Sequence, residues 1–509
     1  MSLLAIDIGT SRAKGVAFNS SGAILAHCER DYSPQFPKPA FAELDPEIFW
    51  QAFCTLCRTI SERLRQDPIE ALCISSHGES FLPVDQSGRA LGPAVLNLDA
   101  RATAESDWCA TAIGAEHLFQ ITGLVAHPMY PLPKLLWLRK HCPELFASAW
   151  FVPVATYLLT RLRLPPLVDY SLASRFLAFD VLRRCWSSEI LSACGIEVER
   201  LPIPVPAGSL AGRLEPDTAQ NLALEQGVMV VVGGHDQACA ALGVGSIESG
   251  RVSGSAGTYE CLAAVSSAPH LGDAAFTANL NSYCHVVPDL YLNLAYFPSG
   301  IMMKWFCDLL YDNNARDTAS QSSDEAAHYA WLEAHAPDGP TGLCIAPHLI
   351  GTCHPDFNPY ARGMVWGLGP GSNRFQLYKG ILEGIAFEFA SITECLEKIT
   401  GPFSEVHVAG GGTRSPLGVK LRAALSGKKL HLSICSEATC LGGAILAGVT
   451  ARMYRSIPEA VQAMVHESSV VEPDSSEAAR YQQQRIRYRA LYAAVRDVAQ
   501  PYSEQQGEC

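Results

Sequence analysis

Short apolar segments that alternate with helical patterns run through most of this chain. This alternation predicts an α/β architecture, in which helices connect the strands of a largely parallel sheet. Near the start, two apolar segments flank a polar turn at residues 7–14, and residues 250–265 repeat this arrangement. Both turns contain a Gly-Thr pair. Two such hairpins about half a chain apart indicate an internal duplication, with one hairpin opening each of two similar domains.

The length supports this division. The chain has 509 residues, too many for one hydrophobic core, because single domains usually hold roughly 100–200 residues. Hydrophobic residues make up 48% of the chain and charged residues 17%, a balance typical of globular proteins and not of disordered ones. We therefore expect two domains, 1–246 and 247–509.

The charge and the hydropathy pattern exclude two classes of partner. Lys and Arg number 38 and Asp and Glu 51, which gives a formal net charge of −13 and argues against the basic surface that nucleic acids require. No apolar run reaches the ~18 residues of a membrane span. The N-terminus lacks a basic region, and Asp7 interrupts its apolar stretch, so we expect no signal peptide and a cytoplasmic protein.

The 18 cysteines are scattered along the chain, and several lie within apolar runs. In a protein without an export signal this distribution is typical of reduced, buried thiols. Cys54 and Cys57 form a lone CxxC, and no second pair follows at the spacing of a zinc site. We interpret the two as neighbours one turn apart on a helix.

The turn after the first strand is the first candidate for chemistry. Asp7 ends the strand, and Mg²⁺ prefers carboxylate oxygens beside phosphates. The glycine in the turn permits close approach of a phosphate, to which Thr10, Ser11 and Lys14 could donate. The alternative is a tight β-turn that Asp7 caps.

Asp236 is the sharpest single candidate. It follows the apolar strand 228–232 and two glycines, at the strand end where α/β proteins gather ligand sites. Its carboxylate could accept a proton from an attacking hydroxyl; the alternative is a helix N-cap. We interpret His235 as a local hydrogen-bonding residue, because no second metal ligand stands at a suitable spacing.

Three further stretches place polar groups near strand ends. Residues 405–409 predict a buried strand, followed by a Gly-Gly-Gly turn and a helix over 417–425. Such a turn is either a nucleotide cradle or a packing device. The polar groups of 76–79 suit a polyhydroxylated ligand. Asp99 and Arg101 either join that site or form a loop salt bridge.

In combination, these motifs resemble the FGGY family of carbohydrate kinases over nearly the whole chain. Residues 129–141 (MYPLPKLLWLRKH) are similar to the family's N-terminal signature, and residues 40–50 to its Glu-x-Asp-Pro-x-x-x-Trp stretch. The order also agrees: the Asp-x-Gly-Thr turn, the His-Gly strand end, the signature, Gly-Gly-x-Asp, the second Gly-Thr turn and the Gly-Gly-Gly turn.

The resemblance implies two actin-like ATPase domains, each with a ribonuclease H-like sheet, and an interdomain cleft. The N-terminal domain would bind the sugar, and the C-terminal domain, with its C-terminal helix, would bind ATP. The implied reaction transfers the γ-phosphoryl group of ATP to a sugar hydroxyl with Mg²⁺, in carbohydrate catabolism. Sugar and ATP are then the partners, and a homodimer is the implied oligomeric state.

The resemblance also implies roles for individual residues. Asp236 corresponds to the catalytic base, and Asp7 and Asp236 to the residues that organise Mg²⁺. The implied ATP-binding residues are Thr10, Ser11, Lys14, Ser255, Gly257, Thr258, Gly411 and Gly412, with 436–444 beside the adenosine loop. The implied sugar-binding residues are Ser76, His77, Glu79, Asp99 and Asp236.

Departures from well-known members bear on the substrate. Ser76 stands where xylulose kinases usually carry the methionine of Met-His-Gly, and Asn97 replaces their tryptophan. Glu79 resembles the corresponding glutamate of glycerol kinases, but the arginine that precedes that glutamate in glycerol kinases is replaced by Gly78 in this chain. Residues 254–260 are closer to the corresponding turn of fuculose-type kinases. We expect a ketose, such as xylulose or another pentulose or hexulose, ahead of glycerol.

Three alternatives differ in their predictions. A polyol kinase of the glycerol type would use the same machinery on another acceptor. A non-catalytic actin-like sugar sensor could lose Asp7, Lys14, Asp236 and Thr258, yet all four are present. A Rossmann-type oxidoreductase would require GxGxxG after the first strand, which this chain lacks.

Overall fold

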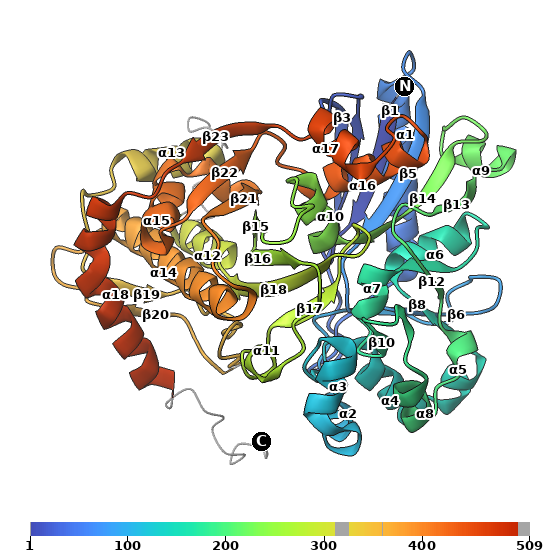
Figure 1. Ribbon diagram of the computed structural model, residues 1–509, viewed down its shortest axis with the longest axis horizontal. Coiled ribbons are helices and arrows are strands. Elements are labelled where there is room, and N and C mark those ends of the chain that lie inside the picture. Colours follow the sequence, from blue (N-terminus) through green and yellow to red (C-terminus); the bar gives the residue numbers. More distant parts are fainter. Residues whose placement is uncertain (1, 311–324, 359, 497–509) are drawn as a thin grey trace. The chain divides into compact units, whose positions relative to one another are not determined.

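The computed structural model describes residues 2–310, 325–358 and 360–496 (Figure 1). The chain forms two compact units, and each unit is built from segments that are not continuous in sequence. The first unit contains the chain up to Ser249 together with Val265–Asn293 and Glu437–His466. The second contains Gly250–Ala264, Leu294–Ser436 and the chain from Glu467 onward.

A six-stranded mixed sheet forms the centre of the first unit. Its order is β13-β14-β5-β1-β2-β3. The bounds are β1 (Ser2–Ile8), β2 (Arg12–Phe18), β3 (Ile24–Asp31), β5 (Ile69–Ser76), β13 (Leu210–Arg213) and β14 (Met229–His235). Strands β1, β5 and β14 pair in parallel, and the outer pairs are antiparallel. The three parallel strands are almost entirely buried, as expected of strands covered on both faces.

The register of these parallel strands brings three candidate segments to one edge of the sheet. Asp7 pairs with Ser75, and His235 pairs with Ser76. Parallel strands end at a common edge, so the residues that follow them meet there. The carboxyl ends of β1, β5 and β14 therefore place Asp7, the 76–79 segment and Asp236 together.

Two helices cover opposite faces of this sheet. Helix α1 (Pro46–Arg63) begins with Asp45 as its N-cap and Pro46 in its first turn, both favoured at helix starts. A Cβ at Gly15 would meet Ile60 and Leu56 of α1. Helix α16 (Ala438–Thr450) packs on the other face, where a Cβ at Gly443 would meet Ala5 and Cys73.

Helix α10 (Asp236–Gly243) lies tightly against α16 in the same unit (Figure 1). A Cβ at Gly442 would lie 1.9 Å from the carbonyl oxygen of Cys239, and one at Gly243 would lie 1.9 Å from that of Ala438. Glycine is required at both positions because the two backbones touch. This contact fixes α10, whose first residue is Asp236.

Shorter elements complete the first unit. The strands are β4 (Glu43–Leu44), β6 (Leu82–Val84), β7 (Ala94–Val95), β8 (Trp150–Val152), β9 (Leu167–Asp169), β10 (Phe179–Asp180), β11 (Cys185–Trp186), β12 (Ile203–Val205) and β17 (Asn281–Cys284). The helices are α2 (Thr103–Cys109), α3 (Ala115–Thr122), α4 (Pro131–His141), α5 (Pro143–Ser148), α6 (Val154–Arg161), α7 (Tyr170–Ser174), α8 (Ser188–Cys194), α9 (Pro216–Asn221), α11 (Asp273–Thr277) and α17 (Ile457–Met464).

The second unit has its own mixed sheet, in which β16-β15-β21-β22-β23 are neighbours. The bounds are β15 (Val252–Ala256), β16 (Tyr259–Ser266), β21 (Glu405–Ala409), β22 (Lys429–Ser433) and β23 (Glu467–Val471). Strands β15, β21 and β22 pair in parallel. The remaining elements are β18 (Tyr291–Pro298), β19 (Cys344–Ala346), β20 (Met364–Trp366), α12 (Gly300–Leu310), α13 (Glu325–Ala334), α14 (Arg374–Thr400), α15 (Pro416–Ser426) and α18 (Ser475–Arg496).

The structure agrees with the elements expected from the sequence. The strand expected at 405–409 is β21, the helix expected at 417–425 is α15, and the helical tail is α18. Cys54 and Cys57 are buried on α1 with unbridged thiols. Across the described ranges, no helix has the length and apolar character needed to cross a membrane.

The α10–α16 contact can be tested with Gly442→Ala. The added methyl group must displace the Cys239 carbonyl, and such overpacking costs about 1–3 kcal/mol in unfolding free energy. We expect a lower midpoint in chemical denaturation. Gly371→Ala is the matched control, because Gly371 is exposed and a Cβ there meets nothing within 4 Å. Equal stability of the two variants would contradict the close contact.

Candidate active site

Asp7 and Asp236 are two buried carboxyl groups at the carboxyl edge of the first sheet. Burial raises the pKa of Asp7 to about 6, against the opposing hydrogen bond from the Ser75 hydroxyl at 3.2 Å. Burial, and then the charges of Asp7 and Glu79, raise the pKa of Asp236 well above its usual value. A hard divalent cation would offset this repulsion. The pair therefore fits a site for Mg²⁺.

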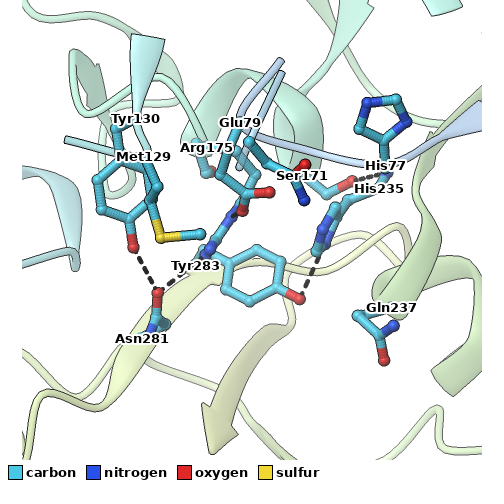
Figure 2. Close-up of polar contacts among 12 residues, drawn as sticks. His77, Glu79, Met129, Tyr130, Ser171, Arg175, His235, Gln237, Asn281 and Tyr283 are labelled. Atoms are coloured by element: carbon cyan, nitrogen blue, oxygen red, sulfur yellow. Dashed lines mark hydrogen bonds and ion pairs between the residues drawn. The ribbon is translucent and has the colours of Figure 1, made fainter. Parts of the chain in front are cut away.

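His235 is a buried imidazole beside the carboxylate of Asp236. Burial lowers the pKa of His235 to about 3, so the ring is neutral and carries one proton. Its Nδ1 lies 3.1 Å from the Tyr283 hydroxyl (Figure 2). Its Nε2 lies 3.1 Å from Asp236 Oδ1. The Asp236 Oδ1 atom accepts a hydrogen bond from the Gln237 amide at 2.6 Å.

A buried ion pair lies beside this group. Arg175 Nε donates to Glu79 Oε1 at 2.5 Å, and Arg175 Nη1 donates to Asn281 Oδ1 at 3.2 Å (Figure 2). The Tyr130 hydroxyl donates to the same oxygen of Asn281 at 2.8 Å. Burial alone would raise the pKa of Glu79, but the Arg175 guanidinium holds it below its usual value. The buried cation is thus neutralised within the protein.

Gly78 makes room for this ion pair. A Cβ at position 78 would lie 2.9 Å from Arg175 Cγ and 2.9 Å from His235 Cδ2. Arg175 therefore takes the space that a side chain at position 78 would need. Glu79 follows with a φ of 61°, a left-handed conformation that is uncommon outside glycine.

His77 connects two of the strand ends. Its Nδ1 lies 2.8 Å from the Ile8 carbonyl oxygen, and its Nε2 lies 2.8 Å from Ser80 Oγ. Because Ser80 Oγ also accepts from the Asn97 amide, its hydroxyl proton is available to His77 Nε2. Burial lowers the pKa of His77. The ring is therefore neutral, with its proton on Nδ1.

Lys134 supports the same loops from within the core. Its ammonium group donates to the carbonyl oxygens of Leu96, Met129 and Glu79 at 2.6, 2.7 and 3.2 Å. Burial lowers the pKa of Lys134 to about 7. This contact explains why a lysine stands in the 129–141 signature, since it joins α4 to the segments around Glu79 and Leu96.

Both carboxylate oxygens of Asp99 accept hydrogen bonds from other groups of the protein. Its Oδ2 accepts from the Ala42 amide at 2.7 Å, and both of its oxygens accept from Arg101. Arg101 also pairs with Glu43 at 2.5 Å. The loop salt bridge, one of the two interpretations open from the sequence, is present. Ser76 is buried, with its hydroxyl donating to the His77 carbonyl at 3.2 Å.

The first polar turn carries Thr10, Ser11 and Lys14. Thr10 donates to Asn97 Oδ1 at 3.3 Å, which connects this turn to the loop that holds Asp99. Lys14 Nζ lies 2.7 Å from Glu437 Oε2, at the start of α16. Ser11 is exposed. The structure thus brings Asp7, the polar turn, residues 76–79 and Asp236 to one edge.

The predicted ATP-binding residues of the second unit also come together. Strands β15 and β21 end in register, with Ser255 opposite Ala409. A Cβ at Gly410 would lie 2.5 Å from the Ala256 carbonyl oxygen, and one at Gly412 would lie 2.8 Å from Ala256 Cβ. The turn with Gly257 and Thr258 and the turn with Gly411 therefore lie side by side. A Cβ at Gly411 would meet nothing within 4 Å, so its backbone is open to a ligand.

Sequence reasoning missed the residues that complete the site in the first unit. These are Tyr130, Arg175, Asn281 and Tyr283. Arg175 is the only charged residue of the stretch 171–179 (SLASRFLAF), which was a usable signal for a buried ion pair. Asn281 and Tyr283 lie on β17, after the chain has passed through the second unit, and no local pattern marks them.

Comparison with known proteins decides the family. The model of the FGGY carbohydrate kinase N-terminal domain matches residues 2–243, and that of the C-terminal domain matches residues 252–451. The chain belongs to the FGGY family of carbohydrate kinases. It is an ATP-dependent carbohydrate kinase, a phosphotransferase with an alcohol group as acceptor.

Individual relatives of this kinase differ in the substrate that they are named for. The chain is 29% identical over 500 residues to a xylulose kinase of Escherichia coli strain K12, covering 96% of this chain and 98% of the relative. It is 24% identical over 451 residues to a gluconokinase of Bacillus subtilis strain 168, covering 87% and 86%. In fold it is similar to a xylulose kinase from Lactobacillus acidophilus, with a TM-score of 0.86, 22% identity and coverage of 97% and 98%. The two-domain α/β fold predicted from the sequence is confirmed.

The buried ion pair of this kinase can be tested with Glu79→Gln. The substitution leaves the Arg175 guanidinium buried without a countercharge, which typically costs about 3–5 kcal/mol. We expect chemical denaturation to show a loss of that size. The double variant Glu79→Gln/Arg175→Met removes both charges and should recover most of it. If Glu79→Gln is as stable as the parent, the Glu79–Arg175 pair does not stabilise the first unit.

Proposed function

We propose that this kinase phosphorylates a neutral ketose, a pentulose such as xylulose or a hexulose. The observation that carries the proposal is the Glu79–Arg175 ion pair, whose partners lie 2.5 Å apart with both side chains buried. A sugar acid requires a cation for its carboxylate, because burying an unpaired charge is costly. A neutral sugar requires only hydrogen-bond donors and acceptors.

The cationic side chains beside Asp236 are not available to an anion. Arg175 is paired with Glu79, and His77 and His235 are neutral at neutral pH. Lys134 donates to three carbonyl groups in the core. The remaining polar groups, among them the Tyr283 hydroxyl and the Gln237 side chain, suit sugar hydroxyls (Figure 2). This chemistry supports a ketose over gluconate.

In the proposed reaction Asp236 is the general base. Its carboxylate accepts the proton of the attacking hydroxyl, and its raised pKa brings it closer to the basicity that this task needs. The Gln237 amide donates to one oxygen of this carboxylate at 2.6 Å. Phosphoryl transfer depends mainly on position and charge neutralisation, so Asp236 need not be a strong base.

We further propose that residues 1–246 bind the sugar and residues 247–509 bind ATP. Ser255, Gly257, Thr258, Gly411 and Gly412 would bind the nucleotide, as glycine turns at strand ends commonly do. Thr10, Ser11 and Lys14 would bind its phosphates. Asp7 and Asp236 would hold Mg²⁺, which neutralises charge on the transferring oxygens when bound. A cytoplasmic location and a homodimer stay predictions.

Asp236→Ala tests the assigned base. Loss of a positioned general base lowers kcat by roughly 10²–10⁴-fold, whereas ATP affinity should change only a few-fold. A coupled assay of ADP release measures kcat, and calorimetric titration with ATP measures the ATP affinity. Asp236→Asn, which keeps the shape of the side chain, should be similarly inactive. If ATP binding disappears with activity in both variants, Asp236 is structural.

The proposed substrate class is tested by kcat/KM across ketoses, aldoses, polyols and gluconate at saturating Mg·ATP. We expect one neutral ketose to exceed gluconate by roughly 10²-fold or more, because gluconate would bury an unpaired carboxylate. Glycerol should also be poor, since it offers fewer hydroxyls to the site. Gluconate as the best substrate would contradict the proposal, and so would a panel without any turnover by a protein that still binds ATP.

A further inference from the structure

Three metal-binding side chains converge on the sheet of the second unit, among residues with no part in the proposed kinase reaction. They are His407 on β21, His431 on β22 and Glu467 on β23, and one ligand atom from each lies within 4.8 Å of the other two. His407 is buried, His431 is partly exposed, and the Glu467 side chain is 42% exposed. An ion could therefore enter from the Glu467 side.

The strand register builds this cluster. His407 lies directly opposite His431 in the parallel β21–β22 pair, and Glu467 lies opposite Ser433. Residues two apart on a strand share a face of the sheet, so Glu467 lies on the same face as His431. The two imidazole rings stack with their centroids 4.6 Å apart. The cluster is thus fixed by backbone pairing across three adjacent strands.

The carboxylate of Glu467 joins the two rings. Its Oε2 lies 2.8 Å from His431 Nδ1, and its Oε1 lies 3.3 Å from His407 Nδ1. In a tetrahedral site with metal–nitrogen distances of ~2.1 Å, neighbouring ligand atoms lie about 3.4 Å apart. The two distances between an Nδ1 atom and the Glu467 carboxylate are therefore close to, or below, this value.

The second ring nitrogen of His431 has a suitable supporting partner. His431 Nε2 lies 3.1 Å from Glu405 Oε2, and a metal-bound histidine typically donates its other N–H to such a carboxylate. His407 differs, because its Nε2 faces Arg251 Nη1 at 3.4 Å. With an ion on Nδ1, His407 carries its proton on Nε2, where it meets this donor. Arg251 therefore opposes the metal-bound state.

We propose that His407, His431 and Glu467 form a binding site for a divalent transition-metal ion of the zinc class. Two imidazole nitrogens and one carboxylate are a ligand set that Zn²⁺ takes readily, with a water molecule at the remaining position. Mg²⁺ prefers oxygen ligands, so the ion of the proposed phosphoryl transfer does not compete here. The bound ion joins the edge strand β23 to β21 and β22.

The position of Glu467 gives the ion a structural effect. Glu467 is the residue at which the chain enters the second unit for the last time, and β23 is an edge strand with mostly exposed residues. An edge strand held on one side only opens readily. A metal ion between Glu467 and the two histidines would reduce opening of β23.

The test titrates Zn²⁺ into the full-length, chelator-treated protein without nucleotide and follows binding by calorimetry. We expect the parent protein to bind one Zn²⁺ ion. The affinity should fall by at least about 100-fold in His431→Ala and in Glu467→Gln. Glu405→Gln should weaken binding about tenfold, and Arg251→Gln should strengthen it. Glu189→Gln is the matched control, since His117 and Glu189 form an exposed pair at 2.6 Å outside the cluster. It should leave binding unchanged.

Two results would overturn the proposal. One is Zn²⁺ binding of equal affinity in the parent, His431→Ala and Glu467→Gln proteins. The other is a Co²⁺ spectrum with sulfur-to-metal charge transfer, which would place the ion on cysteine thiols. Because Glu467 is largely solvent-exposed, Glu467→Gln should fold normally. Slower amide exchange of residues 467–471 in the presence of Zn²⁺, absent in Glu467→Gln, would support the structural effect.

Discussion

The parallel pairing of β1, β5 and β14 is the constraint on which the candidate site depends. It brings Asp7, Ser76 and His235 to one edge of a buried sheet, and the residues after them provide the carboxylates, the neutral histidines and the buried ion pair. A shift of one residue in any of these strands would turn its side chains to the opposite face. The close α10–α16 contact then fixes Asp236 relative to this edge.

Charge compensation within the first unit explains how such a polar edge remains stable and selective. Glu79 and Arg175 neutralise each other, Lys134 donates to carbonyl groups, and burial keeps His77 and His235 neutral. Asp7 and Asp236 are the exception, because burial raises the pKa of both carboxyls and the charge of Asp7 raises that of Asp236 further. The remaining excess charge is negative, so the site suits a divalent cation and an uncharged acceptor.

Much of this fold could be predicted from the sequence because its signals are local. Apolar runs followed by glycine turns gave β1, β14 and β21 with the candidate residues at their ends, and the ordered motifs gave the family. Arg175, Asn281 and Tyr283 could not be placed, because their roles depend on pairing between segments distant in sequence. For Asp99 the sequence left two interpretations open, and only the contacts with Ala42 and Arg101 separate them. Local patterns also do not predict that each unit is built from segments distant in sequence.

The account is tested most directly by identifying the phosphorylated product with ³¹P nuclear magnetic resonance. Its central claim is that Asp236 takes the proton of a neutral sugar hydroxyl, so the phosphoryl group must end on that oxygen. With Mg·ATP and the preferred ketose, we expect one phosphomonoester resonance coupled to carbon-bound protons, formed in equal amount to ADP. Release of inorganic phosphate alone, or a phosphomonoester formed only with gluconate, would contradict the account.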